Sequence, residues 1–239
     1  MGGRFLIVFL CAVLALPAAA ITPASPGNPL NQEFVTHSLA AKGKKKKGKP
    51  KPRIVRQTVT QTFRNLTPIA IPETGSASPY PAAIGVTGLT NGAITDVNVT
   101  LEGFSHATSR DVDILLAPAH LPNLDAILMS DVGGPSDVSN LTVTFDDQAA
   151  SALSFSSPLA SGTFRPSNDD AGGADGWPGQ TPTGNVSLQV FNSANPNGSW
   201  QLFVVDDSGT DDGKIARGWP LPVTAEVDKA IAKKKKKKR

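Results

Sequence analysis

The stretch GSWQLFVVDDSGTDDGKIARGWPL, from Gly198 to Leu221, decides the fold that we expect for this chain. Its first part is apolar at Trp200, Leu202 and Val204, and also at Phe203 and Val205 between them. Apolar residues on both faces are typical of a strand in a protein interior. Aspartate and glycine then dominate a polar segment before a second apolar run. The stretch therefore predicts a buried strand, an acidic hairpin turn and a second strand.

Four other segments show the alternation of apolar and polar residues that favours half-buried strands. They are ITDVNVTLEGF (94–104), DVDILLA (111–117), NLTVTFDD (140–147) and VSLQVF (186–191). No segment shows the pattern of a long helix. About eight strands, each with one apolar face, bury those faces when two sheets pack together. We therefore predict an all-β, jelly-roll-like β-sandwich over residues 54–226.

The two ends of the chain have a different composition. Residues 1–20 hold one basic residue, an apolar run from Phe5 to Leu16 and then the small residues Ala18, Ala19 and Ala20, which predicts a secretory signal peptide and a secreted protein. The apolar run is short for a membrane span, and no later segment is apolar enough to cross a membrane. The only cysteine, Cys11, lies in this run. We expect a disordered Lys/Pro-rich linker over 21–53 and a poly-Lys tail over 227–239. The short, alanine-rich signal segment and the lysine runs favour a bacterial source.

Charge divides the chain sharply. Between Ile54 and Asp228 there are six basic and 19 acidic residues, a net charge of −13. The predicted polyanion-binding residues are Lys44, Lys45, Lys46, Lys47, Lys233, Lys234, Lys235, Lys236, Lys237 and Lys238. Lysine runs bind anionic lipid head groups and anionic envelope polymers without reading their detailed structure. No aromatic residues lie among the lysines, so we expect no specific nucleic-acid binding. Alternatively, the tails only keep an acidic body soluble or fold back onto it.

The acidic residues include candidate ligands for Ca²⁺, which prefers six to eight oxygen atoms. The predicted ligands are Asp111, Asp113, Asp206, Asp207 and Asp211. Asp169, Asp170 and Asp175, in a Gly- and Pro-rich loop, form a second and weaker candidate. The alternative reading is that these residues only build polar turns.

The order and spacing of several motifs resemble the P domain, also called Homo B. This domain follows the catalytic domain in kexin- and furin-like proprotein convertases and in bacterial secreted proteases. The motifs are IPETGSASPYPAAIGVTGL (71–89), ITDVNVTLEGFSH (94–106), DVDILLAP (111–118), FDDQAA (145–150), SGTFRPSN (161–168) and FNSANPNGSWQLFVVDDSGTDDGKIARGWPLPV (191–223). The resemblance covers about residues 60–224 and implies a jelly-roll-like sandwich that binds calcium in some members.

The sequence does not predict an enzyme. The family's subtilisin-like domain has no counterpart here, and His37, His106 and His120 have no neighbouring nucleophile motif. We therefore expect a non-catalytic interaction or adhesion module that its basic tails retain at the cell envelope. One alternative is an accessory chain that docks to a separate subtilisin-like serine protease. Another is a lectin-like carbohydrate-binding module that uses Trp177 as an exposed ligand-binding aromatic.

Overall fold

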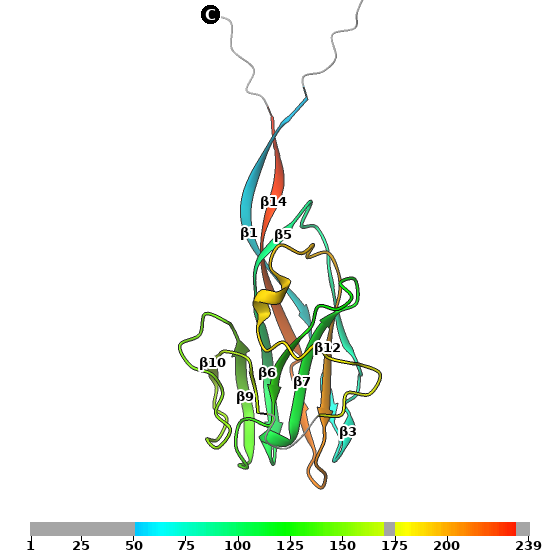
Figure 1. Cartoon of the computed structure of the whole chain (residues 1–239), viewed down its shortest axis with the longest axis vertical. Helices are drawn as coiled ribbons and strands as arrows, with labels where there is room; N and C mark the ends of the chain where they lie inside the picture. The colour runs from blue at the N-terminus through cyan, green and yellow to red at the C-terminus, as the bar shows by residue number, and fades with distance from the viewer. Residues whose placement is uncertain (1–50, 170–174, 233–239) are drawn as a thin grey trace, which may run out of the picture. The chain divides into compact units, whose positions relative to one another are not determined.

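The computed structural model describes residues 51–169 and 175–232, and this part of the chain is an all-β sandwich (Figure 1). The expected signal peptide, most of the linker, and both lysine runs (44–47 and 233–238) lie outside the described residues. The first sheet has the order β1 (Arg53–Asn65), β14 (Trp219–Ile231) and β5 (Ala93–Val97). The second has the order β10 (Gly162–Phe164), β9 (Val138–Phe145), β6 (Val99–His106), β13 (Gly213–Ile215) and β2 (Ile69–Ile71).

The third sheet has the order β11 (Ser167–Asn168), β8 (Ala126–Ser130), β7 (Val112–Pro118), β12 (Gly198–Asp206) and β3 (Gly75–Ser76), with β4 (Ala82–Val86) also paired to β12. The described residues also form the 3₁₀ turns η1 (Ser109–Asp111) and η3 (Leu188–Phe191). None of the described helical segments is long and apolar enough to cross a membrane.

The first two sheets are joined by backbone hydrogen bonds and face the third. The Asn98 amide donates to the Pro222 carbonyl at 3.0 Å, and the Glu102 amide donates to the Gly218 carbonyl at 3.0 Å. The main core lies between the layers, and its largest fully buried side chains include Phe104, Phe145, Trp200 and Trp219. Apolar burial of this extent is the dominant favourable contribution to folding.

Strand β12 is buried on both faces, as the sequence predicts. Trp200, Leu202 and Val204 belong to the main core. Phe203 and Val205 point to the other side of the sheet and pack with Leu115, Ile127 and Trp177 in a second apolar cluster. The central strands β7, β8 and β12 of the third sheet therefore carry buried apolar side chains on both faces.

The acidic turn after β12 is not the hairpin loop that the sequence suggests. Strand β12 pairs with β7, β3 and β4, whereas β13 pairs with β6 and β2 in the opposite layer. The turn is therefore an arch that carries the chain from one layer to the other. Local composition identifies a turn but does not specify which strands it connects.

Two other expectations about secondary structure need correction. The predicted strand over 94–104 is divided at Asn98, because β5 pairs with β14 while β6 pairs with β9. The predicted strand over 186–191 is instead the 3₁₀ turn η3. There the Gln189 amide donates to the Asp147 carboxylate at 2.8 Å and to the Ser187 hydroxyl at 3.2 Å. Such side-chain acceptors offer the backbone an alternative to a strand ladder.

Strands β1 and β14 form the longest paired element, with 13 residues in each. Their antiparallel register runs from Arg53 opposite Ile231 to Asn65 opposite Trp219. Strand β5 pairs with β14 only between Val223 and Glu226, so the strands continue beyond it as a two-stranded ribbon (Figure 1). The sheet thus begins one residue before the predicted boundary at 54 and ends five residues after the one at 226.

Burial predicts a large difference between two phenylalanines. Phe104→Ala removes a fully buried ring, and we expect it to lower the free energy of unfolding by about 3–5 kcal/mol. The matched control Phe155→Ala changes a ring that is 45% exposed, and we expect a change below about 0.5 kcal/mol. Urea denaturation followed by far-UV circular dichroism measures both. Similar losses in the two variants would contradict this assignment of the core.

Candidate metal centre

Three carboxylates from separate parts of the chain converge at one end of the third sheet. Asp113 lies in β7, Asp207 directly follows β12, and Asp175 lies in the loop before Trp177. Each offers a carboxylate oxygen, and these oxygens all lie within 4.8 Å of one another. Asp113 is 1% exposed, Asp175 is half-buried and Asp207 is exposed. The group therefore extends from the protein interior to its surface.

Strand pairing places Asp113 and Asp207. Asp113 lies opposite Val205 in the β7–β12 register, and Asp207 follows two residues later. Side chains alternate along a strand, so Val112 and Ile114 reach the main core while Asp113 points to the other face. The Asp207 amide donates to the Asp111 carbonyl at 3.1 Å, which holds the start of the turn against β7.

The loop that carries Asp175 is fixed by apolar packing and hydrogen bonds. Trp177 is buried in the second apolar cluster, two residues after Asp175. The Tyr80 hydroxyl donates to the Pro178 carbonyl at 3.1 Å, and the Ser130 hydroxyl donates to the Asp175 carboxylate at 2.7 Å. These contacts hold Asp175 over the end of the sheet.

The electrostatics of this cluster favour a bound cation or proton. Burial, followed by the nearby carboxylates of Asp175 and Asp207, raises the pKa of Asp113 to about 8. Burial raises the pKa of Asp207 as well, with Asp175 adding to the effect. Asp131, which follows β8 with a φ of 55°, has its pKa raised to about 6 by burial and then by Asp175 and Asp207.

One atom of the cluster lacks any hydrogen-bond partner within the described structure. It is Oδ2 of Asp113, which is buried beside the two other carboxylates. An unpaired buried carboxylate oxygen is costly unless a proton or a cation satisfies it. The cluster offers carboxylate oxygens and no imidazole or thiolate ligand, a donor set that suits Ca²⁺ better than Zn²⁺.

The structure brings together two of the five predicted ligands, Asp113 and Asp207, and places the other three elsewhere. Asp111 forms an ion pair with Arg110 at 3.7 Å. Asp206 points into the interior toward His106, and Asp211 accepts a hydrogen bond from the Thr108 hydroxyl at 2.8 Å. Of the five candidate ligands, only Asp113 and Asp207 therefore belong to this cluster.

The third residue of the cluster, Asp175, comes from the loop that sequence reasoning ranked second. Its position depends on Trp177, which sequence reasoning assigned to an exposed ligand-binding surface. Trp177 is only 8% exposed, so that assignment is wrong. The sequence did contain one indication of this arrangement, the single tryptophan within a Gly- and Asp-rich loop. Such a residue can anchor its loop on an apolar surface and so fix the position of its neighbours.

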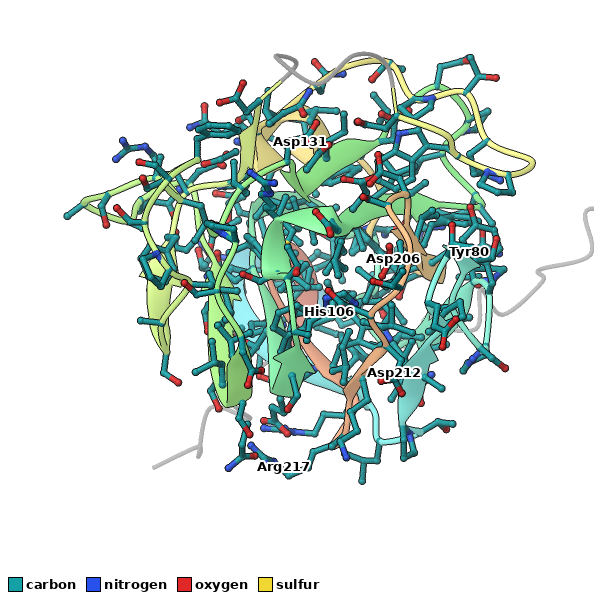
Figure 2. The ribbon with its side chains drawn as sticks, turned by 90° about the horizontal axis from the view of Figure 1, so that it is seen from below. Tyr80, His106, Asp131, Asp206, Asp212 and Arg217 are labelled. Atoms are coloured by element: carbon teal, nitrogen blue, oxygen red, sulfur yellow. The ribbon has the colours of Figure 1, made fainter. Side chains whose placement is uncertain are left out.

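His106 and Asp206 form a buried pair (Figure 2), and Asp206 directly precedes Asp207 of the cluster in the sequence. Nε2 of His106 lies 2.9 Å from Oδ2 of Asp206, both side chains are fully buried, and neither atom has another partner. Nδ1 of His106 lies 2.9 Å from the Thr108 carbonyl. Both ring nitrogens therefore face groups other than a serine hydroxyl, unlike the base of a Ser-His-Asp triad.

The other described histidine also contacts the backbone. Nδ1 of His120 lies 3.3 Å from the Ser199 carbonyl, and Nε2 lies 3.0 Å from the Asn195 carbonyl. These contacts tie the segment after β7 to the start of β12. His37 lies outside the described residues.

Comparison of the chain with protein-family models, curated proteins and solved structures gave no match.

The cluster predicts a stabilising response to calcium. Chelation by EDTA lowers the melting temperature, and added Ca²⁺ restores it, because an ion that binds only the folded state stabilises that state. Asp113→Asn removes this response. The control Asp212→Asn removes an exposed charge from the same turn, outside the cluster, and keeps the response. Differential scanning calorimetry measures all three proteins; a response that survives in Asp113→Asn would exclude this cluster.

Without divalent cations, stability should fall as the pH rises from about 4 to about 8. The pKa of Asp113 is raised from 3.8 to about 8 on folding. The unfolded chain therefore releases its proton first, and the stability contributed by Asp113 is fully present below the lower value and lost as the pH rises through the higher one. Melting temperatures in EDTA across this range test the prediction. Asp113→Asn should flatten the curve, and an already flat curve for the unaltered protein would contradict it.

Proposed function

We propose that this protein is an exported, non-catalytic interaction module that its two lysine runs hold at an anionic cell-envelope surface. The acidic end of the sandwich, with its candidate calcium site, faces away from that surface and meets a partner. The observation that carries this proposal is the pairing of Arg53 with Ile231 at the end of the β1–β14 ribbon.

This pairing supports a combined action of the two lysine runs. One run precedes Arg53 in the sequence and the other follows Ile231. The chain therefore enters and leaves the ribbon at the same end, from positions about 5 Å apart, the spacing of adjacent strands. Two binding segments attached at one point act with a high effective concentration toward each other's targets. Neither run alone needs a high affinity.

The charge distribution supports one orientation on the surface. The turn after β12 lies at the opposite end of the sandwich from the ribbon end (Figure 1). That turn adjoins the cluster of Asp113, Asp175 and Asp207. An anionic surface attracts the lysine runs and repels the acidic end. The electrostatic field of the protein therefore favours an orientation with the ribbon end toward the surface.

Calcium would act at the acidic end of the sandwich. Asp113, Asp175 and Asp207 would hold the ion, which would neutralise their mutual repulsion. Those residues connect β7, the turn after β12 and the loop of Trp177. The surface formed by these three parts is where we propose that a partner binds.

The resemblance to P domains also supports a non-catalytic role. In that family the sandwich accompanies a separate catalytic domain. The accessory role beside a subtilisin-like protease stays a prediction of that resemblance. A lectin-like role through Trp177 is not proposed, because this side chain lies in the second apolar cluster.

Salt extraction of cells tests retention at the envelope. We expect the exported protein to stay with the cell envelope at low ionic strength and to be released by about 0.5 M NaCl, because each neutralised anion contributes to the salt dependence of polyanion binding. Replacing Lys44–Lys47 and Lys233–Lys238 by glutamine should release the protein at low salt. Immunoblotting of cell and medium fractions measures the distribution.

A charge-preserving variant serves as the matched control. Replacing the same lysines by arginine keeps the positive charge, so retention and its salt dependence should persist. If the glutamine variant stays with cells as firmly as the unaltered protein, the lysine runs are not the anchor and the proposal fails. Melting temperatures show whether the sandwich remains folded in each variant.

A further inference from the structure

We propose that the end of the β1–β14 ribbon inserts Ile54 and Ile231 into an anionic lipid membrane. This inference rests on the proposed function and narrows its target from anionic envelope material in general to a lipid surface. The ribbon end is defined here as residues 51–55 and 229–232.

Apolar side chains are exposed on both faces of the ribbon end. Ile54 is 52% exposed and Ile231 is 45% exposed, which places both among the few large apolar side chains at the surface. Ile54 lies opposite Ala230, and Ile231 lies opposite Arg53 one position further along. Because side chains alternate along a strand, Ile54 and Ile231 point to opposite faces. The ribbon end therefore exposes one isoleucine on each of its two faces, so neither face is packed against the core.

Positive charge accompanies these apolar side chains. Lys51, Arg53 and Lys229 are exposed at the ribbon end, which holds no acidic residue. The nearest acidic residue, Asp228, already pairs with Arg56 at 3.3 Å and accepts from Asn91 at 2.9 Å. These hydrogen bonds, from Asn91 and then from Arg56, hold the pKa of Asp228 below its usual value. An anionic surface therefore meets cations first, and Arg56 already offsets the repulsion that the carboxylate of Asp228 would exert on that surface.

The combination of apolar and basic side chains favours lipid over a hydrated polymer. Isoleucine gains little by contacting a hydrated wall polymer, whereas burial among acyl chains removes its apolar surface from water. Membrane attachment is stable when a cationic patch is combined with an apolar insertion. Beyond β5 the ribbon has only two strands, so unpaired backbone groups remain along its edges. Such groups are costly in hydrocarbon, which limits insertion to the level of the head groups.

Vesicle binding by an isoleucine variant tests this inference. The protein is purified after export, with its N-terminus determined by mass spectrometry so that residues 1–20 do not contribute an apolar segment. The double variant I54S/I231S is compared with the unaltered protein. We expect it to bind vesicles of equal parts phosphatidylglycerol and phosphatidylcholine about tenfold or more weakly. Binding to soluble polyphosphate should be unchanged, because the lysine runs are intact.

The matched control is L66S/F155S, which removes two other exposed apolar side chains away from the ribbon end. It should bind both ligands like the unaltered protein. A fluorophore sensitive to polarity, attached to A230C, should shift to shorter wavelength with the vesicles, whereas one attached to S208C in the acidic turn should not. Cys11 is the only native cysteine, so export with removal of residues 1–20 leaves each introduced thiol unique.

The possible outcomes separate the two proposals. If I54S/I231S binds vesicles as well as the unaltered protein while polyphosphate is also bound, insertion is excluded and the lysine runs alone account for polyanion binding. If the unaltered protein binds neither vesicles nor polyphosphate, the proposed function fails and this inference fails with it. Selective loss of vesicle binding, with an unchanged melting temperature, supports insertion.

Discussion

Burial of β12 on both faces is the constraint on which the rest of this structure depends. One face of the strand supplies Trp200 to the main core, and the other supplies Phe203 to the second apolar cluster. The second cluster fixes Trp177, which in turn places Asp175 beside Asp113. The end of the same strand delivers Asp207. A loss of packing around β12 would therefore remove the core and the candidate metal site together.

Local patterns in the sequence were sufficient for the fold class and for β12, because alternation and double-sided apolarity are properties of one strand. They were insufficient where the outcome depends on distant partners. The turn η3 forms because Asp147 accepts from the Gln189 amide, and a sequence window around Gln189 does not contain Asp147. The position of Asp175 likewise depends on the packing of Trp177 against β7, β8 and β12. Strands β7 and β8 lie more than 40 residues before Trp177 in the sequence, outside any local window.

Acidic residues serve three separate purposes in this sandwich, although they look alike in the sequence. Asp113 is buried without a hydrogen bond on Oδ2 and belongs to a cluster that suits a cation. Asp206 pairs with His106 inside the protein, and Asp211 accepts from Thr108 on the side of the turn. Burial and the nearest partner distinguish these roles, and neither can be read from the spacing of aspartates along the chain.

The register of the β1–β14 ribbon also determines how the protein bears mechanical load. The two strands end side by side, at Arg53 and Ile231. If the segments beyond them are held at a surface while flow drags the sandwich, the force pulls on both strands in the same direction. The hydrogen bonds between β1 and β14 then carry little of the tension. Pulling the two ends apart would instead open those bonds one after another from Arg53 and Ile231 inward. A shared attachment point thus resists drag better than two separate ones would.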